Sequence, residues 1–367
     1  MKGLENMEIE IQKIPDSELK LLVTDNSKLG FGTVYTDYMF TMEWSKGAGW
    51  HNAQLSKYGT IPFDPASVII QYAQQVFEGM KAFCSKDGEI LLFRPDENAK
   101  RMYSSAQRLC MEPVETEDFL QAVKAVVNID KRWLPKGVGT SLYIRPTLIG
   151  DGVKLGVHPS DRYLFCVLMT AVGPYFANGF NPISLYVEDK YVRACVGGVG
   201  DAKTSGNYAA SLLAGAKAET MGYSQVLWLD AATKKHVEEA GSMNIFFVYG
   251  NKVVTPRLTG SILPGITRKS VLALAPTMGF EAEERDLSID DVIRDIENGS
   301  LTEAFGTGTA AVIAPVGSLF YKGKSYAIGK GADQVGSVTT KLYEKLVSIQ
   351  YGESDDPFHW VCKAGKI

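Results

Sequence analysis

The chain has 367 residues, enough for two compact domains, and its 45% hydrophobic and 22% charged residues are typical of a globular protein. Its 38 Lys and Arg against 42 Asp and Glu give a net charge of −4, which argues against a nucleic-acid-binding surface or a polybasic membrane anchor. The first residues lack the apolar core of a signal peptide, and the longest apolar run is too short to span a bilayer. Five widely separated cysteines without a CxxC pair favour a reducing cytoplasm, and four scattered histidines disfavour a metal site.

Two segments in the first half of the chain show a clear periodicity. Apolar residues recur at helical spacing across 119–127, after a threonine cap signal and before a proline stop. Residues 141–149 alternate instead, as in a strand, so that Tyr143 and Arg145 share one face opposite the apolar side chains. We therefore predict a helix followed by a strand here.

A stretch rich in Gly, Pro and Asn, GPYFANGFNP, begins at Gly173 and is typical of a linker. We predict a smaller N-terminal α/β domain over 1–173, a linker over 174–182 and a larger cofactor-binding domain over 183–367. The predicted class is α+β, built from these two α/β domains.

Patterns in the second half predict a hairpin and a terminal helix. Residues 243–248 and 253–254 are strand-like runs separated by Gly250-Asn251-Lys252, which is typical of a hairpin turn. Residues 333–351 have the pattern of a helix.

The segment 197–210, GGVGDAKTSGNYAA, places Lys203 in a Gly-rich loop that leads into an apolar helix. Small neighbours let a bulky ligand approach the backbone, and partial burial lowers the pKa of a lysine so that its neutral amine can act as a nucleophile. A solvated lysine on a surface turn is the alternative interpretation, and the residues alone leave both open.

Three further places favour a phosphorylated, nitrogen-containing ligand. Glu238 and Glu239 would point to opposite faces of a strand, one solvated and one turned inward towards a cationic partner such as a protonated pyridine nitrogen. Gly265 precedes a predicted helix whose free amides and dipole suit a phosphate, and the 306–310 loop offers more donors. Taken singly, two surface glutamates and two ordinary turns explain these residues as well. Taken together with a reactive lysine, they fit pyridoxal phosphate, which needs partners for its aldehyde, pyridine nitrogen and phosphate.

At these residues the sequence resembles the branched-chain amino acid aminotransferases, which have the fold-type IV pyridoxal-phosphate architecture. The matching runs follow the family's order over almost the whole chain: EGMKAF, LFRP, LYIRP, GGVGDAKTSGNYA, EEAGSMNIFF, LPGITR and EAFGTGTAA.

The resemblance implies roles for the cofactor side of the site. Lys203 would carry pyridoxal 5'-phosphate as a Schiff base and move the proton during catalysis. Tyr208 would hydrogen-bond the phenolic oxygen of the cofactor, and Glu239 would pair with its pyridine nitrogen. The phosphate would be bound by Arg94, the amides of Ile266 and Thr267, and the Thr309 hydroxyl.

The resemblance also implies a substrate side. It would consist of Phe31, Tyr72, Phe77, Tyr143, Arg145, Tyr175 and Ala310. Arg145 would bind the side-chain carboxylate of glutamate or 2-oxoglutarate, and the Thr309 and Ala310 amides would hold the α-carboxylate. Tyr72 would come from the second subunit of a homodimer. For each aromatic residue, packing in a core is the alternative, above all for Phe31.

The implied activity is transfer of the amino group of leucine, isoleucine or valine to 2-oxoglutarate, giving the branched 2-oxo acid and glutamate. The protein would be a cytoplasmic homodimer that acts on these small molecules and binds neither nucleic acid nor a membrane. D-amino acid aminotransferases and aminodeoxychorismate lyases are alternatives with the same fold, but the length, LYIRP and EGMKAF favour the branched-chain group. A non-catalytic scaffold is a more distant alternative, against which the complete set of cofactor residues argues.

Overall fold

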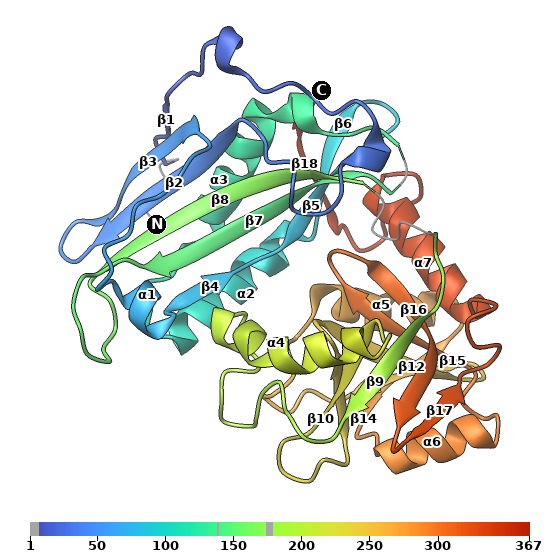
Figure 1. Ribbon diagram of the computed structural model, residues 1–367. Helices are drawn as coiled ribbons and strands as arrows, with labels where there is room; N and C mark the ends of the chain where they lie inside the picture. The colour runs from blue at the N-terminus through green and yellow to red at the C-terminus, as the bar shows by residue number, and fades with distance from the viewer. Residues whose placement is uncertain (1–6, 138, 174–178) are drawn as a thin grey trace. The chain divides into compact units, whose positions relative to one another are not determined.

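The computed structural model describes three stretches of the chain: 7–137, 139–173 and 179–367. They form two compact units (Figure 1). The first unit contains the described residues up to 173 together with 202–205 and 349–367, and the second contains 179–201 and 206–348. Each unit has its own nine-stranded sheet within the described residues, accompanied by helices. The predicted α+β class is confirmed.

The first sheet is antiparallel except for one pairing among the described strands, that of β1 with β3. In spatial order the strands are β1 (Glu10–Ile11), β3 (Gly49–Lys57), β2 (Tyr38–Ser45), β8 (Arg162–Val172), β7 (Ser141–Gly150), β5 (Met80–Cys84), β6 (Glu89–Phe93) and β18 (Val361–Lys366), with β4 (Gln75–Phe77) paired to β7. Strand β7 confirms the prediction for 141–149. Its Leu142 and Ile144 lie in the core, so Tyr143 and Arg145 face the opposite side of the sheet.

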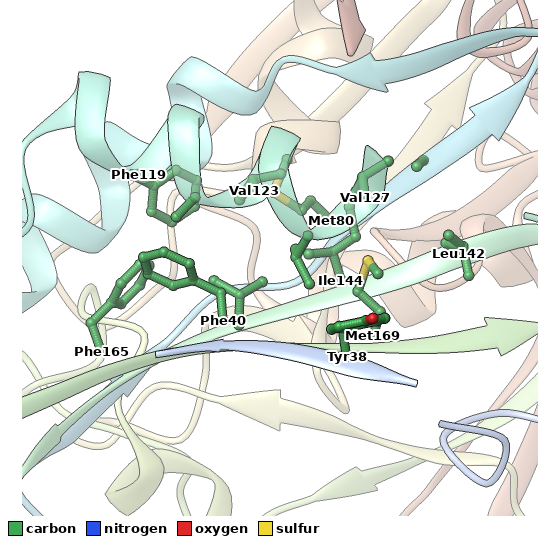
Figure 2. Packing of buried hydrophobic residues seen from close by; sticks show 14 of the residues in the cluster. Tyr38, Phe40, Met80, Phe119, Val123, Val127, Leu142, Ile144, Phe165 and Met169 are labelled. Carbon is green, nitrogen blue, oxygen red and sulfur yellow. The ribbon is translucent and has the colours of Figure 1, made fainter. Parts of the chain in front are cut away.

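Helices α2 (Pro95–Arg108) and α3 (Thr116–Ile129) cover the core face of this sheet. Helix α3 confirms the prediction from apolar spacing, and Figure 2 shows its Phe119, Val123 and Val127 directed at the strands. The rings of Phe119 and Phe165 lie 6.1 Å apart, and both side chains are fully buried. Burial of each such side chain stabilises the fold by about 1.5–3 kcal/mol, so this layer fixes the strands that carry the site. The short helices of the unit are η1 (Asp16–Glu18), η2 (Asn26–Lys28), α1 (Val68–Tyr72) and η3 (Lys131–Trp133).

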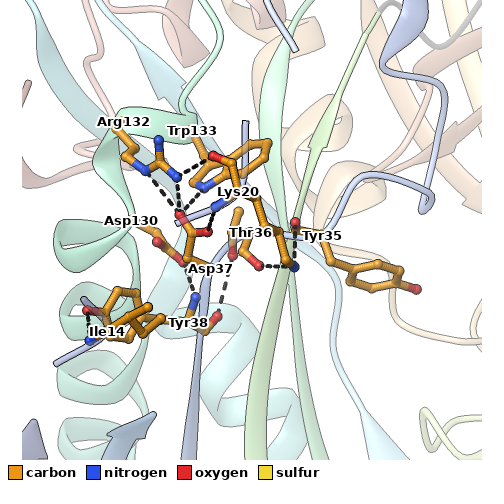
Figure 3. Close-up of polar contacts among 9 residues, drawn as sticks. All are labelled: Ile14, Lys20, Tyr35, Thr36, Asp37, Tyr38, Asp130, Arg132 and Trp133. Atoms are coloured by element: carbon orange, nitrogen blue, oxygen red, sulfur yellow. Dashed lines mark hydrogen bonds and ion pairs between the residues drawn. The ribbon is translucent and has the colours of Figure 1, made fainter. Parts of the chain in front are cut away.

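A buried ionic cluster fastens the N-terminal segment to the end of α3 (Figure 3). The carboxylate of Asp37 accepts hydrogen bonds from three groups: Arg132 Nε, Trp133 Nε1 and the Lys20 amide. Asp130 accepts a hydrogen bond of 2.7 Å from the Tyr38 amide at the start of β2. Because residues 20 and 37 are both held by this cluster, it anchors the two ends of the segment that contains Phe31.

The second sheet closes on itself over part of its width. Its strands are β11 (Val237–Ala240), β10 (Gln225–Leu229), β9 (Ile183–Glu188), β16 (Val312–Tyr321), β15 (Glu303–Gly308), β12 (Met243–Tyr249), β13 (Lys252–Pro256) and β14 (Glu281–Arg285), with β17 (Lys324–Ala327) on β16. An additional pairing joins β11 to β12, so the strands from β11 to β12 in this order form a closed ring. Strands β12 and β13 are the predicted hairpin. A strand in such a ring has one face inside it, and the other can be covered from outside.

The helices of the second unit are α4 (Ser205–Thr220), α5 (Ile266–Thr277), α6 (Ile289–Glu297) and α7 (Ser337–Gln350), of which α4 and α7 each extend by a residue or two into the first unit. Helix α7 confirms the predicted terminal helix but begins four residues late. Helix α4 exposes Leu212 and Leu213 and buries Ala214 and Ala218.

The compact units differ from the predicted domains at two places. Residues 349–367, predicted to belong to the C-terminal domain, lie in the first unit because β18 pairs with β6. Residues 202–205 also group with the first unit. Much of the predicted linker, including Tyr175, lies outside the described residues, so the boundary at 174–182 stays a prediction.

Candidate active site

The backbone around Lys203 is fixed by two elements of the first unit, α2 and β4. The Lys203 amide donates to Ser105 Oγ on α2 at 3.0 Å, and its carbonyl accepts from the Phe77 amide at 3.0 Å. The neighbouring Thr204 forms a bridge with Val76 and donates from Oγ1 to the Gln75 carbonyl at 2.8 Å. The Gly-rich loop predicted from sequence therefore presents Lys203 on a rigid support rather than on a solvated turn.

The amine of Lys203 lies in a poorly solvated environment, with Nζ 4.8 Å from the centre of the Phe77 ring. The pKa of Lys203 is lowered to about 8, chiefly by burial and then by the positive charge of Arg101, against the opposing effect of the Glu78 carboxylate. A lysine with a pKa near 8 holds a substantial neutral fraction at physiological pH, as a nucleophilic amine requires.

Glu78 and Arg101 form a buried ion pair that sequence reasoning missed. Glu78 is fully buried, and its two oxygens lie 2.7 Å from Arg101 Nε and 2.8 Å from Arg101 Nη2. Asn98 Nδ2 adds a third hydrogen bond, of 2.7 Å, to Glu78. Asn98, Arg101 and Ser105 follow one another at helical spacing on α2, so one helix face holds both Glu78 and the Lys203 backbone. An arginine in a polar helix carries no sequence signal of its own, and Glu78 stood out only as part of EGMKAF.

Arg94 contacts a different part of the first unit. It is the N-cap residue of α2, its guanidinium lies 4.9 Å from the centre of the Trp360 ring, and its Nη2 lies 3.9 Å from Glu97 Oε2. Its amide donates to the Trp360 carbonyl. Arg94 thus has contacts with the C-terminal segment, and Arg101 acts electrostatically on Lys203.

Four predicted substrate-side residues lie together in the first unit. Arg145 Nη2 donates to the Tyr143 hydroxyl at 3.0 Å, and the Arg145 guanidinium lies 4.8 Å from the centre of the Phe77 ring. The Phe31 and Tyr143 rings meet edge to face at 4.9 Å. A side chain at Gly79 would collide with the Tyr143 hydroxyl, so only glycine fits there. The group is an aromatic wall with one guanidinium beside it.

Lys81 is a further cation near this group that sequence reasoning passed over. It pairs with Tyr143 across β5 and β7, so the two side chains share a face of the sheet. Burial lowers the pKa of Lys81 to about 8.

Tyr72 has a different partner in the first unit, and the predicted pair Thr309 and Ala310 belongs to the second unit. Tyr72 ends the short helix α1, and its hydroxyl accepts from the Gly156 amide at 2.7 Å. Thr309 and Ala310 form the turn between β15 and β16 of the second unit.

In the second unit, Glu239 is held as an oriented carboxylate. It is 3% exposed, and its Oε2 lies 2.5 Å from Arg193 Nε. Its Oε1 accepts from Asn244 Nδ2 and from the Leu263 amide, both at 3.0 Å. Glu239 and Asn244 face each other where β11 closes against β12. Sequence reasoning found Glu239 but gave no role to Asn244, which lies in the same EEAGSMNIFF run, or to Arg193, which lies outside the quoted motifs.

A cavity of about 190 Å³ opens beside this carboxylate. Glu239, Asn244, Tyr208 and Trp228 contribute to its wall. It therefore brings together two of the predicted cofactor residues, Tyr208 and Glu239. An anionic, rigidly held carboxylate in a cavity suits a cationic ring nitrogen.

The N-terminus of α5 fits an anion. Gly265 is its N-cap and supplies no side-chain hydrogen bond to the first turn, where Ile266 and Thr267 are both buried. A side chain at position 265 would collide with Asn244 Oδ1. Free amides at the positive end of a helix bind phosphate, and glycine lets the ligand approach. Asn244 also donates to the Leu263 carbonyl at 2.9 Å, linking this helix start to Glu239.

The expectation that one of the two consecutive glutamates is solvated is wrong. Glu238 is 4% exposed and Glu239 is 3% exposed. Both faces of β11 are covered because the strand belongs to the closed part of the sheet.

The described residues contain no helix long and apolar enough to cross a membrane. Within the same residues, no cluster of three or more His, Cys, Asp or Glu side chains is arranged to hold a metal ion.

Comparison with known proteins defines the class. The sequence model of the class IV amino-transferases matches residues 75–319. Branched-chain-amino-acid transaminase 1 of Bacillus subtilis (strain 168) is 50% identical over 337 residues, which cover 92% of this chain and 94% of that protein. Branched-chain-amino-acid aminotransferase 2 of the same organism is 46% identical over 94% of each chain.

Solved structures agree with this. A branched-chain amino acid aminotransferase from T.th., solved with pyridoxamine 5'-phosphate, has a TM-score of 0.74 at 28% identity, and the match covers 88% of this chain and 98% of that one. The Escherichia coli branched-chain amino acid aminotransferase has a TM-score of 0.72 at 27% identity, over 90% and 99%. The chain belongs to the class IV aminotransferases and has their fold-type IV architecture. Within that class it belongs to the branched-chain group.

Proposed function

We propose that the chain is a pyridoxal-phosphate-dependent branched-chain-amino-acid transaminase. It transfers the amino group of leucine, isoleucine or valine to 2-oxoglutarate and releases the branched 2-oxo acid and glutamate. The observation that carries the proposal is the position of Lys203. Its amine lies over Phe77, whose ring also contacts Arg145, so a nucleophilic amine and a carboxylate-binding cation lie against one aromatic ring.

When bound, pyridoxal phosphate supplies an electron sink that lets a proton leave the substrate α-carbon. Lys203 Nζ then serves as the base that accepts this proton and later returns it. A pKa near 8 suits a group that both takes and gives a proton near neutral pH. Ser105 and Phe77 hold the Lys203 backbone, so the amine is positioned before substrate arrives.

In the second unit, Glu239 would pair with the ring nitrogen and Tyr208 with the phenolic oxygen. The amides of Ile266 and Thr267 would hold the phosphate at the uncapped start of α5, with the Thr309 hydroxyl as a further donor.

As the cationic partner of the phosphate we propose Arg101, with Arg94, which the resemblance implies, as the alternative. Arg101 is oriented by Glu78 through two hydrogen bonds and acts on Lys203. Arg94 is engaged with Trp360.

The substrate side must accept both a branched alkyl chain and a carboxylate. Phe31, Phe77 and Tyr143 offer apolar surface, and Arg145 offers charge beside it. Arg145 Nε is buried and has no hydrogen-bond partner within the described residues, which leaves a donor available for a substrate carboxylate. The Ala310 amide, with that of Thr309, would bind the α-carboxylate. The assignment of Tyr175 to the substrate side remains a prediction.

We also propose a cytoplasmic homodimer, in which a second copy covers an apolar surface of α1 and the loop after β7. Ile70 on α1 and Leu155 and Val157 on the loop are 54%, 65% and 90% exposed. Tyr72 ties the two segments together through its bond with Gly156. Exposed apolar groups gathered in this way are typical of a protein interface, and Tyr72 would there reach the substrate side of the partner.

The test combines labelling with a substrate panel. The purified chain is loaded with pyridoxal phosphate, reduced with borohydride and mapped by mass spectrometry, and 2-oxoglutarate consumption is followed with leucine, isoleucine, valine and D-alanine. We expect the label on Lys203 and turnover with the three branched L-amino acids. A label on another lysine, or turnover with D-alanine alone, would overturn the proposal.

A further inference from the structure

The two buried glutamates of β11 differ in their partners. Glu239 has a donor on each carboxylate oxygen. Glu238 has a hydrogen bond at Oε1 with Ser261 Oγ, whereas its Oε2 is buried without a hydrogen-bond partner in the described part of the chain. An ionised carboxylate accepts several hydrogen bonds, so leaving one of its oxygens bare in the interior is costly. The geometry suits the neutral acid, in which only a carbonyl oxygen lacks a partner.

The charges around Glu238 lead to the same conclusion. Burial raises the pKa of Glu238 above its ordinary 4.5; the hydrogen bond with Ser261 and the charges of Arg193 and Lys234 oppose this rise without cancelling it, and Asp230 reinforces it. Glu239 on the same strand already forms an ion pair with Arg193. A single guanidinium can neutralise only one of the two carboxylates, so a second buried charge would be uncompensated.

A chain of hydroxyl groups connects Glu238 to the surface. Ser261 Oγ lies 2.8 Å from Thr259 Oγ1, and Thr259 is exposed. The acid proton of Glu238 can be donated to Ser261, which donates in turn to Thr259. The proton can therefore exchange with solvent although Glu238 is buried.

Ser261 also fixes Arg193 through its backbone. The Ser261 carbonyl and the Gly200 carbonyl both accept from Arg193 Nη2, the latter at 2.9 Å. A side chain at Gly200 would collide with the Ser261 backbone, so the loop before Lys203 packs directly on this residue. Arg193 is thus held by two carbonyls while its Nε pairs with Glu239.

We propose that Glu238 is a positioning residue: as a neutral acid it holds Ser261, and through the Ser261 carbonyl it keeps the Arg193 guanidinium on Glu239. One part of this inference rests on the proposed function, namely that Glu239 pairs with the ring nitrogen of the cofactor. When Glu238 ionises, it competes with Glu239 for Arg193, and the orientation of Glu239 is weakened.

The test compares Glu238→Gln, a neutral side chain of the same size, with Glu238→Ala. The matched control is Glu188→Gln, because Glu188 is also a buried glutamate of this unit and, within the described residues, bonds the amides of its own turn at Lys190 and Tyr191. The dissociation constant of pyridoxal phosphate is measured by absorbance titration from about pH 6 to about pH 9, the range over which a buried acid of raised pKa ionises.

At the lower pH we expect Glu238→Gln to bind within about twofold of the unchanged chain, and Glu238→Ala about tenfold more weakly, as for loss of one hydrogen bond in a charged network. As the pH rises, the dissociation constant of the unchanged chain should increase about fivefold or more relative to Glu238→Gln, as an unpaired buried charge would cause. Ionisation of Lys203 or of the cofactor changes the dissociation constants of both proteins alike, so these effects cancel in the ratio of the two constants. Glu188→Gln should follow the unchanged chain at every pH.

A second readout needs no cofactor. The free energy of unfolding of the cofactor-free chain should fall relative to that of Glu238→Gln as the pH rises from 4.5, because the folded state binds the Glu238 proton more tightly. Equal pH profiles for the unchanged chain and Glu238→Gln in both measurements would overturn the inference. Failure of the unchanged chain to bind pyridoxal phosphate would instead overturn the proposed function.

Discussion

Arg145 donates a hydrogen bond of 3.0 Å from Nη2 to the Tyr143 hydroxyl, two residues earlier on the same face of β7. This bond orients the guanidinium, and its Nε remains available. Replacement Arg145→Met should therefore raise the KM for 2-oxoglutarate by about tenfold to a hundredfold, as loss of a charged hydrogen-bonded pair does. The KM for leucine should change by less than about threefold, because an alkyl chain makes no charged hydrogen bond.

Initial-rate kinetics with each substrate varied in turn measures both constants. Tyr143→Phe is the matched control, since it removes the bond to Arg145 but keeps the guanidinium and the ring. We expect it to show a smaller effect of the same direction. Equal losses for leucine and 2-oxoglutarate in Arg145→Met would contradict the role of Arg145 as the carboxylate partner.

The roles of Arg101 and Arg94 can be distinguished by comparing the binding of pyridoxal phosphate with the binding of pyridoxal, which lacks the phosphate. Arg101→Met alone would leave the fully buried Glu78 unpaired, at a cost of about 3–5 kcal/mol. The informative variant is the double change Glu78→Gln with Arg101→Met, which removes both charges of this ion pair together. We expect this variant to lose about tenfold or more of the preference for pyridoxal phosphate over pyridoxal, since one charged contact to phosphate is gone.

Arg94→Met is the comparison, and we expect it to keep that preference. Equilibrium titration with the two ligands gives the ratio directly. If Arg94→Met lost the preference and the double variant kept it, the phosphate contact would belong to Arg94, as the LFRP resemblance implied.

The periodicity of apolar residues predicted the regular helices and strands that have one buried face. It did not predict the burial of residues in the closed part of the second sheet. The spacing across 119–127 and the alternation across 141–149 correspond to α3 and β7, because each has one buried face. Alternation failed at Glu238 because β11 lies in the closed part of the sheet and is covered on both faces. Pairing of β18 with β6 joins residues far apart in sequence, which no local pattern encodes.

The candidate site shows the same division. Lys203, Glu239 and Gly265 lie in loops or strand ends with distinctive composition, so they could be found in the sequence. Arg101 and Arg193 lack such a context. Their roles arise from the ion pairs with Glu78 and Glu239, which exist only in the folded chain.

The exposed loop after β7 gives a prediction about assembly. Val157 is 90% exposed, so a charge there has no cost in an isolated chain but must be buried in a dimer that covers it. Val157→Asp should shift the chain from dimer to monomer, with a dissociation constant raised by about a hundredfold or more for a buried unpaired charge. Sedimentation velocity over a concentration series measures this. Leu21→Asp is the control, because Leu21 is 93% exposed and lies outside the proposed interface. Equal behaviour of the two variants would count against this surface as the interface.

Asp130 gives a pH dependence of stability. Burial raises its pKa from 3.8 to about 6, although the Tyr38 amide and the Thr36 side chain lower it. The folded chain therefore binds this proton more tightly than the unfolded chain. Its contribution to the free energy of unfolding is present below pH 3.8 and is lost as the pH rises through about 6. The loss amounts to about 3 kcal/mol at about 1.4 kcal/mol for each pKa unit.

Asp130→Asn should remove this loss and so stabilise the chain relative to the unchanged protein above about pH 6, by up to about 3 kcal/mol. Urea unfolding at several pH values measures the difference. Asp355→Asn, on an exposed side chain, should shift the midpoint little at any pH. A stabilisation by Asp130→Asn that did not grow between pH 4 and 7 would show that ionisation of Asp130 is not its cause.

The lowered pKa of Lys203 predicts how fast the cofactor attaches. Only the neutral amine attacks the aldehyde, and the pKa is about 8 because of burial and Arg101. The rate of covalent attachment should rise about tenfold for each pH unit below 8 and level off above it, whereas an ordinary lysine would continue to rise towards 10.5. Stopped-flow absorbance with the cofactor-free chain gives this profile. Lys81 is the matched control, since burial lowers its pKa to about 8 as well. Lys81→Met should keep the pH profile of attachment, and Lys203→Met should abolish attachment. The reverse result would show that Lys81 on β5, and not Lys203, is the reactive amine.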